Sequence, residues 1–281
     1  MKINIDEINV ERDKDEEKVF IVSFPKSGRT WLRVLLSRYK QNLLGIDEFY
    51  IKLHAMFAEG PIASPQFIFY HGRSSVVEGE IPSRARKIVQ ALVPSKRNVE
   101  YPFDLSYCRG SKIVFLVRDP RDTIVSYFHQ ATSRSRIYKG SLSEFIRDPL
   151  FGVQRLLGFL NFLAENSHAI EHHIVHYEDL HTNTLGELSA VLQFADVDVN
   201  REHIREAIKF AKFENMKKME QEESQGHKLS PKDKDDPNSF KVRKGKIGSF
   251  LDELSESDIE YLEEQIDEHL PSMFSRYGQA S

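Results

Sequence analysis

The sequence predicts an α/β domain with a mostly parallel central sheet flanked by helices. Short apolar segments rich in β-branched and aromatic residues alternate along the chain with segments whose apolar residues recur at helical spacing. The length of 281 residues is within the range of one α/β domain, and the sequence contains no internal repeat. We therefore predict a single domain over residues 1–281, with a charged leader at 1–17 and a flexible loop at 220–248.

The first strand and helix are separated by a short loop. VFIVSF, residues 19–24, has the apolar, β-branched composition of a buried strand. The segment from Thr30 to Gln41 is predicted to be a helix, because its apolar residues recur three and four positions apart. These residues are Leu32, Leu35, Leu36 and Tyr39.

The strand and helix order repeats further along the chain. FIFY at 67–70 and KIVFLV at 112–117 are predicted strands. Asp119 and Pro120 then stand where an N-cap and a first helical turn are expected, so a helix should follow through residue 134. HIVHYEDL, residues 173–180, is predicted to be another strand that runs into a loop.

The remaining apolar patterns predict helices that cover the sheet. Ser141 and Glu144 form a capping-box sequence at the start of one of them. Helical spacing then continues over residues 153–163, 185–195, 204–211 and 259–266. Residues 220–248 have few apolar residues and many charges, which is typical of a long functional or disordered loop.

Composition excludes several classes of protein. The formal net charge of −4 gives no reason to expect nucleic acid as a partner, and the single cysteine, Cys108, excludes an intramolecular disulfide framework. The charged N-terminus does not fit a signal peptide, and no apolar run approaches the ~18 residues of a membrane span. We expect a soluble, cytoplasmic protein without a membrane span.

The first chemical signal is SFPKSGRTW, residues 23–31, between the first strand and its helix. A glycine-containing loop at a helix N-terminus can wrap an anion, so the element resembles a P-loop in its position. Lys26 precedes Gly28 by two residues, whereas the lysine of a Walker A motif follows its glycine. The loop should therefore hold a phosphate differently from an ATPase. The alternative is that Lys26 is a solvated lysine in a turn.

The second signal is RDPRDTIVS, from Arg118 to Ser126, after the strand at 112–117. Ligands of open α/β sheets bind beyond the carboxyl ends of the strands, and arginine suits bidentate binding of phosphate. The alternative is that the arginines and aspartates of this segment only pair with one another.

The third signal is RKGK, residues 243–246, inside the polar loop. A basic run with a central glycine could fold over a phosphate. The alternative is a solvated charged face.

The three signals, in this order, resemble the motifs of the sulfotransferases that use 3′-phosphoadenosine 5′-phosphosulfate (PAPS), especially their soluble bacterial-type members. PKSGRTW resembles the family's 5′-phosphosulfate loop, RDPRDTIVS its 3′-phosphate motif, and RKGKIG its C-terminal phosphate-closing motif. The resemblance assigns the 5′ side of the nucleotide to Lys26, Ser27, Gly28, Arg29 and Thr30. It assigns the 3′-phosphate to Arg118, Ser126, Arg243, Lys244 and Gly245.

The same resemblance places three aromatic residues near the adenine. Trp31 would stack on the base, Tyr177 occupies the place of an adenine-contacting tyrosine, and Phe213 matches a phenylalanine of the family. The family's general base is a histidine at a strand end between the first two motifs, which here indicates His71 after FIFY. His54, in a predicted helix, is the alternative.

Two positions depart from the family pattern. Phe69 replaces a lysine that many members carry two residues before the histidine, which puts a second catalytic lysine in doubt. Arg29 replaces a threonine, which suggests extra positive charge near the sulfate.

The resemblance implies transfer of a sulfuryl group from PAPS to a hydroxyl or amine, with adenosine 3′,5′-bisphosphate (PAP) as product. His71 would remove the acceptor proton, Lys26 would stabilise the leaving phosphate, and Ser126 would hold Lys26 or the 3′-phosphate. No metal is expected, because the sequence has no recognisable metal-ligand pattern.

The acceptor is not identified by the sequence. A small molecule or a glycan is expected, and aromatic residues in the segments 49–66 and 131–138 hint at an apolar or aromatic one. A homodimer is left open. Two other functions also stay open: a P-loop kinase that uses ATP, and a nucleotide-binding protein without catalysis.

Overall fold

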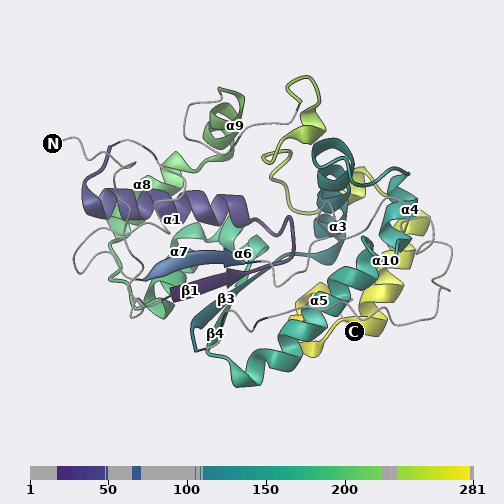
Figure 1. The fold of residues 1–281 in the computed structure, drawn as a ribbon, viewed down its shortest axis with the longest axis horizontal. Coiled ribbons are helices and arrows are strands. Elements are labelled where there is room, and N and C mark those ends of the chain that lie inside the picture. Colours follow the sequence, from purple (N-terminus) through teal and green to yellow (C-terminus); the bar gives the residue numbers. More distant parts are fainter. Residues whose placement is uncertain are drawn as a thin grey trace.

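The structure is a computed structural model that describes residues 18–47, 49, 65–70, 105, 108, 110–222, 229 and 233–278. Within these residues, helices lie on both sides of a parallel sheet (Figure 1). The strands are β1 (Lys18–Val22), β2 (Gln66–Tyr70), β3 (Lys112–Val117) and β4 (His172–His176), and they pair in the order β2-β1-β3-β4.

The central strands bury both of their faces. Phe20 and Phe115 belong to one hydrophobic core, while Ile21 and Val114 belong to a second core on the other side of the sheet. Side chains of a strand alternate between faces, so a strand that is covered twice must be apolar at every position. This is why β1 and β3 stand out in the sequence as continuous apolar runs.

The helices form two layers (Figure 1). The layer that shares its core with Ile21 contains α1 (Arg29–Leu44), α6 (Tyr177–Thr182), α7 (Thr184–Phe194), α8 (Arg201–Phe210) and α9 (Phe213–Gln221). The opposite layer contains α3 (Pro120–His129), α4 (Leu142–Arg147), α5 (Val153–Asn166) and α10 (Glu256–His269).

Short helical turns complete the described fold. They are the π-helix Gln130–Arg134 and the 3₁₀ helices Ser167–Ala169, Pro237–Ser239, Ser249–Asp252 and Ser272–Tyr277. No helix in the described part of the chain is long and apolar enough to cross a membrane.

The predicted helix starts are confirmed. Asp119 accepts a hydrogen bond from the backbone N–H of Arg121 at 2.8 Å, and Pro120 opens α3. Ser141 and Glu144 form both hydrogen bonds of a capping box at the start of α4.

One local prediction was wrong, and one predicted helix changes its type before it ends. The residues after β4 form α6 rather than a loop. The helix expected through residue 134 is α-helical only to His129 and continues as a π-helix. A period of hydrophobic residues does not distinguish one helical type from the other, because the added residue of a π turn hardly changes a short apolar pattern.

Candidate functional site

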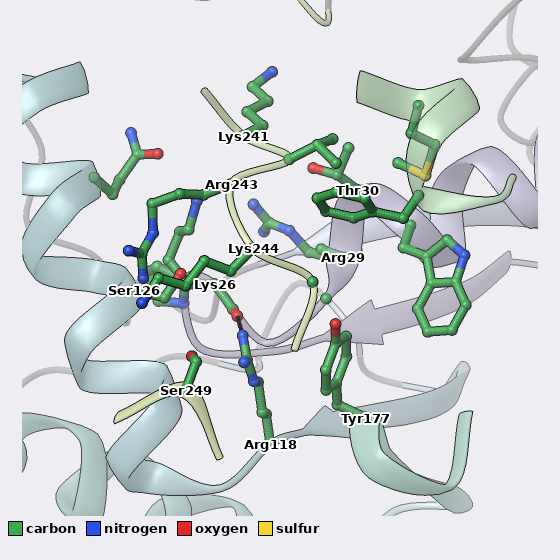
Figure 2. Close-up of a pocket in the computed structure, with 18 of the residues that line it drawn as sticks. Lys26, Arg29, Thr30, Arg118, Ser126, Tyr177, Lys241, Arg243, Lys244 and Ser249 are labelled. Atoms are coloured by element: carbon green, nitrogen blue, oxygen red, sulfur yellow. Dashed lines mark hydrogen bonds between the residues drawn. The ribbon is translucent and has the colours of Figure 1, made fainter. Parts of the chain in front are cut away.

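A cavity of about 520 Å³ lies at the edge of the sheet where the strands have their carboxyl ends. Its walls come from the loop after β1, from α3 and the π-helix, from α6, and from residues 241–245 (Figure 2). The structure therefore brings the three basic motifs of the sequence to one cavity.

The loop after β1 is shaped for close approach to a ligand. Gly28 has φ of 97° and is the N-cap of α1, where no side chain caps the helix. The first N–H groups of such a helix are available to an anion. A Cβ atom on Gly28 would lie 2.5 Å from Cδ2 of Tyr177, so a larger residue would collide with that ring.

Lys26 is a strongly perturbed cation of the cavity wall. Its φ is 73°, a left-handed conformation that is costly for a residue other than glycine. Burial lowers the pKa of its ammonium to about 7, and repulsion from Arg134, Arg243 and Arg118 adds to that effect against the attraction of Glu220. An anion in the cavity would favour the protonated form of Lys26.

Arg118 connects the motifs to one another. Its guanidinium donates to the carbonyl oxygens of Lys26 at 3.5 Å and of Lys246 at 3.1 Å. It also pairs with Asp122 at 3.2 Å and lies 4.4 Å from the centroid of the Tyr177 ring.

The arginine–aspartate pairs that were the alternative for the second motif are therefore present, but the motif also lines the cavity. Arg121 pairs with Asp119 at 2.8 Å, whereas Arg118 and Ser126 line the cavity wall.

The carboxylate of Glu253 contacts two cations of the third motif. Glu253 pairs with Arg243 at 2.7 Å, with Lys244 at 2.8 Å and with His129 at 2.5 Å. Despite its burial, hydrogen bonds from Lys244, His129 and Arg243 lower the pKa of the Glu253 carboxyl to about 2.

The solvated-face alternative fits only part of the RKGK run. The side chain of Lys246 is 61% exposed, but that of Arg243 is 12% exposed and lines the cavity. Gly245 has φ of 60°, and a Cβ atom there would lie 2.5 Å from Cδ2 of Phe213. A second glycine is thus required where the backbone meets an aromatic ring.

The aromatic residues expected near the adenine also line the cavity. Trp31 and Tyr177 make an edge contact with ring centroids 5.9 Å apart, and Trp31 Nε1 donates to the carbonyl oxygen of Ala211 at 3.1 Å. Phe213 lies beside Gly245.

Of the other residues expected in the first loop, Arg29 and Thr30 line the cavity. Ser27 is buried and is not part of the cavity wall.

Sequence reasoning missed three charged residues of the site. Arg134, from the π-helix, and Lys241 line the cavity. Glu220 lies at the end of α9, and its two carboxylate oxygens accept the backbone N–H groups of Lys241 at 2.7 Å and Val242 at 2.9 Å. Glu220 also pairs with Arg134 at 3.6 Å. Its position in a polar, charged stretch of sequence gave no sign that it is fully buried.

The two candidate catalytic histidines, His71 and His54, lie outside the described residues. Strand β2 ends at Tyr70, which pairs in register with Val22 and whose carbonyl oxygen accepts the backbone N–H of Ser23 at 3.3 Å. Most of the segment 49–66 also lies outside the described residues. From the segment 131–138, Arg134, Ser135 and Ile137 line the cavity.

The parallel sheet flanked by helices defines an α/β protein, and the basic cavity at the N-terminus of its first helix is a candidate anion-binding site. The chain belongs to the sulfotransferase domain family, which matches residues 16–274, and it is accordingly an enzyme of the transferase class.

Curated relatives share this family over most of their length. The chain is 26% identical over 278 residues to cytosolic sulfotransferase 15 of Arabidopsis thaliana, covering 91% of this chain and 72% of the relative. It is 21% identical to sulfotransferase 2A2 of Mus musculus, covering 92% of this chain and 87% of the relative. Both come from eukaryotes and lend no support to a bacterial-type subgroup, which stays a prediction.

Solved structures share the fold. A retinol dehydratase in complex with androsterone and the inactive cofactor PAP superposes with a TM-score of 0.60 at 18% identity, covering 94% of this chain and 82% of that one. Mouse sulfotransferase SULT7A1 complexed with PAP gives a TM-score of 0.59 at 17% identity, covering 92% and 86%.

Proposed function

We propose that this enzyme transfers a sulfuryl group from PAPS to a hydroxyl or amine of an acceptor and releases PAP. One observation carries the proposal: a single cavity joins an uncapped helix N-terminus, two separate groups of cations and three aromatic side chains. The binding of PAP by retinol dehydratase and by mouse SULT7A1 supports the choice of nucleotide. The relatives named as cytosolic support a cytoplasmic location.

The residues present fit this nucleotide. Lys26, Gly28 and the first turn of α1 would hold the 5′-phosphosulfate, because a helix N-terminus and a buried ammonium both favour an anion. Arg118, Ser126, Arg243, Lys244 and Gly245 would hold the 3′-phosphate. Trp31, Tyr177 and Phe213 would contact the adenine, and the backbones of Gly28 and Gly245 leave room that a Cβ atom would fill.

Catalysis in this proposal depends on charge and position. PAPS supplies the sulfuryl group. Lys26 stabilises the negative charge that develops on the departing phosphate oxygen, and His71 accepts the proton of the acceptor hydroxyl as its oxygen bonds to sulfur. Ser126 keeps Lys26 or the 3′-phosphate in place. The end of β2 at Tyr70, beside the loop that carries Lys26, supports His71 over His54 as the base.

The nucleotide assignment predicts selectivity for the 3′-phosphate. PAP should bind about tenfold or more tightly than AMP, because a lost charge-assisted contact is worth about 1.5–3 kcal/mol. Titration calorimetry with both nucleotides measures this ratio. Equal affinities would reject the proposed nucleotide, and turnover of ATP without turnover of PAPS would indicate a kinase instead.

The catalytic assignment predicts different losses for two variants. His71→Ala should leave PAP affinity nearly unchanged and lower turnover by about 10²-fold or more, the usual scale for a lost general base. Lys26→Ala should weaken PAPS binding and slow the chemical step by a larger factor. Single-turnover assays with PAPS separate the two effects. Loss of turnover in His54→Ala but not in His71→Ala would move the base to His54.

A further inference from the structure

A network of hydrogen bonds joins the start of α3 to the start of α6. The hydroxyl of Tyr277 donates to Oε2 of Glu178 at 2.7 Å and contacts Nδ1 of His176 at 2.8 Å. The other carboxylate oxygen of Glu178, Oε1, accepts the backbone N–H of Asp119 at 3.0 Å. None of these four residues lines the cavity, so the nucleotide assignment gives them no role.

The protons of this network have one consistent arrangement. A carboxylate only accepts, so the Tyr277 hydroxyl donates to Glu178, and the hydroxyl oxygen accepts from Nδ1–H of His176. Burial lowers the pKa of His176 to about 4, and repulsion from Arg276 adds to that effect against the attraction of Asp179. Burial and the Glu178 carboxylate raise the pKa of Tyr277. At neutral pH the histidine is therefore neutral and the hydroxyl protonated, as this arrangement requires.

Both ends of the network adjoin residues that are assigned to the nucleotide. Asp119 directly follows Arg118, and Glu178 directly follows Tyr177. The Arg118 guanidinium lies 4.4 Å from the centroid of the Tyr177 ring, and both side chains line the cavity (Figure 2). The strands that end just before these two residues, β3 and β4, are neighbours in the sheet. The hydrogen bond from the Asp119 N–H to Glu178 continues this link beyond the last pair of the strands.

The C-terminal 3₁₀ helix, which ends at Tyr277, connects the same two helices. The carbonyl oxygen of Tyr277 accepts a hydrogen bond from Arg121 of α3 at 3.2 Å, while its hydroxyl reaches Glu178 of α6. Arg276 also pairs with Asp179 of α6, but these two side chains are 41% and 39% exposed, whereas Tyr277 is 4% exposed. An exposed ion pair contributes little, so the Tyr277 hydroxyl is the firmer of the two connections.

We propose that Glu178 and Tyr277 are positioning residues for the nucleotide. They keep Arg118 and the ring of Tyr177 at the spacing at which one contacts the 3′-phosphate while the other contacts the adenine. Each acts through a neighbour: Tyr277 orients the Glu178 carboxylate, and Glu178 holds the backbone beside Arg118. The inference rests on the proposed use of PAPS and adds to it two residues outside the cavity wall.

The test compares the affinities for PAP and AMP, because their ratio depends on the contact with the 3′-phosphate and not on folding alone. Tyr277→Phe removes only the hydroxyl and should lower the ratio by about threefold. Glu178→Met removes both hydrogen bonds and leaves the Asp119 N–H without its acceptor, so it should lower the ratio further. Titration calorimetry measures both affinities, and the midpoint of thermal unfolding shows whether each variant is folded.

Two further variants separate positioning from a general loss of stability. Glu178→Gln keeps an oxygen for the Asp119 N–H and can donate its amide to the Tyr277 hydroxyl, so it should recover most of the ratio lost in Glu178→Met. The double variant of Tyr277→Phe with Glu178→Met should have the same ratio as Glu178→Met alone, because the two side chains act in one series of contacts.

The matched controls are Asp179→Asn and Tyr261→Phe. The first weakens the exposed pair between α6 and the C-terminal 3₁₀ helix without changing the acceptor of the Asp119 N–H. The second removes a hydroxyl from α10, where the ring of Tyr261 lies 4.4 Å from the Arg147 guanidinium and is not part of the cavity wall. Both controls should keep the ratio of the unmodified protein.

The inference is overturned if Tyr277→Phe, or a folded Glu178→Met, keeps the ratio of the unmodified protein, or if Asp179→Asn lowers the ratio as much as Glu178→Met does. A ratio in Glu178→Gln as low as in Glu178→Met, or independent effects in the double variant, would also contradict it. If Glu178→Met does not fold, Tyr277→Phe decides the test. Unmodified protein that does not bind PAP, or that binds PAP and AMP equally, would instead reject the proposed function, and this inference with it.

Discussion

Lys26 combines two features that are each unfavourable. Its backbone is in the left-handed region at φ of 73°, and its ammonium is buried among other cations, which lowers its pKa to about 7. Such strain persists where the surrounding structure imposes it, and it is concentrated at functional sites. Both features are understandable if the lysine is arranged for an anion that the cavity receives.

The lowered pKa of Lys26 predicts that PAP affinity depends on pH. Without nucleotide, Lys26 loses its proton above about pH 7, whereas a bound anion raises the pKa of Lys26. Between these two pKa values, binding of the nucleotide is therefore accompanied by uptake of a proton. PAP affinity should therefore decrease as the pH rises from about 7 to about 9. Calorimetry at about pH 8 in buffers of different ionisation enthalpy measures the proton uptake.

Lys26→Met is the control for this prediction. Lys241, with a pKa of about 8, titrates in the same direction, so the variant should lose part of the proton uptake and not all of it. The same uptake in Lys26→Met and in the unmodified protein would show that Lys26 does not sense the nucleotide.

At the residue scale, the sequence identified side chains that belong to a local motif. Lys26, Gly28, Arg118 and Arg243 could be predicted because loop, strand and helix signals surround them. Glu220 could not be predicted, because its carboxylate binds the backbone of Lys241 and Val242, which lie far beyond it in the chain.

The element that carries the third motif is fixed by carboxylates at several points. Glu220 binds the backbone at Lys241 and Val242, and Asp122 accepts the backbone N–H groups of Gly248 at 2.8 Å and Phe250 at 3.0 Å. Glu253 pairs with the cations between those points. The position of residues 241–250 therefore depends on carboxylates from α9, from α3 and from Glu253, which follows this segment.

Replacing the buried carboxylate of Glu220 should disturb this element. Glutamine in Glu220→Gln keeps one acceptor oxygen, but its amide nitrogen would face a backbone N–H, which leaves a buried donor without a partner. Stability should fall by about 1–3 kcal/mol, and PAP should bind more weakly because Arg243 follows the released segment. Urea unfolding and PAP calorimetry measure the two effects.

Glu222→Gln is the matched control, because Glu222 is exposed just beyond the end of α9 and pairs only loosely with Lys218 at 3.7 Å. It should change stability by no more than about 0.5 kcal/mol. Equal effects of the two substitutions would mean that the contacts of Glu220 do not hold residues 241–250 in place.

At the scale of elements, the sequence predicted what local pattern and caps determine. β3 is found at its predicted bounds, and α3 and α4 begin at their predicted caps. The change to a π-helix after His129 carries Arg134 to the cavity, but it could not be predicted. The π-helix contacts residues that are distant in the sequence, such as Ser239, whose carbonyl oxygen accepts a hydrogen bond from Arg134 at 2.7 Å. The expected mobility of residues 220–248 stays a prediction.

The parallel sheet explains how motifs far apart in sequence meet. β1 and β3 end at the same edge, which brings the loop of Lys26 beside Arg118, and Arg118 then bonds to the carbonyl oxygen of Lys246. The sequence predicted a mostly parallel sheet but not the order of its strands, since helix and strand patterns do not give neighbours in a sheet. The cavity wall that results includes α1, α6 and α9 from one helical layer and α3 from the other.

A ligand that bridges the two helical layers should stabilise the whole molecule in one transition. PAP at about 100 times its dissociation constant should raise the free energy of unfolding by about 2.7 kcal/mol, and the midpoint of thermal unfolding by about 5 °C or more. AMP at the same concentration should raise the midpoint less, because it makes no contact with the residues assigned to the 3′-phosphate. Arg118→Met should reduce the shift caused by PAP and leave that caused by AMP largely unchanged. Scanning calorimetry measures all of these midpoints. Two results would contradict a cavity whose cations join the layers through the 3′-phosphate: equal shifts from PAP and AMP, or a PAP shift that Arg118→Met does not change.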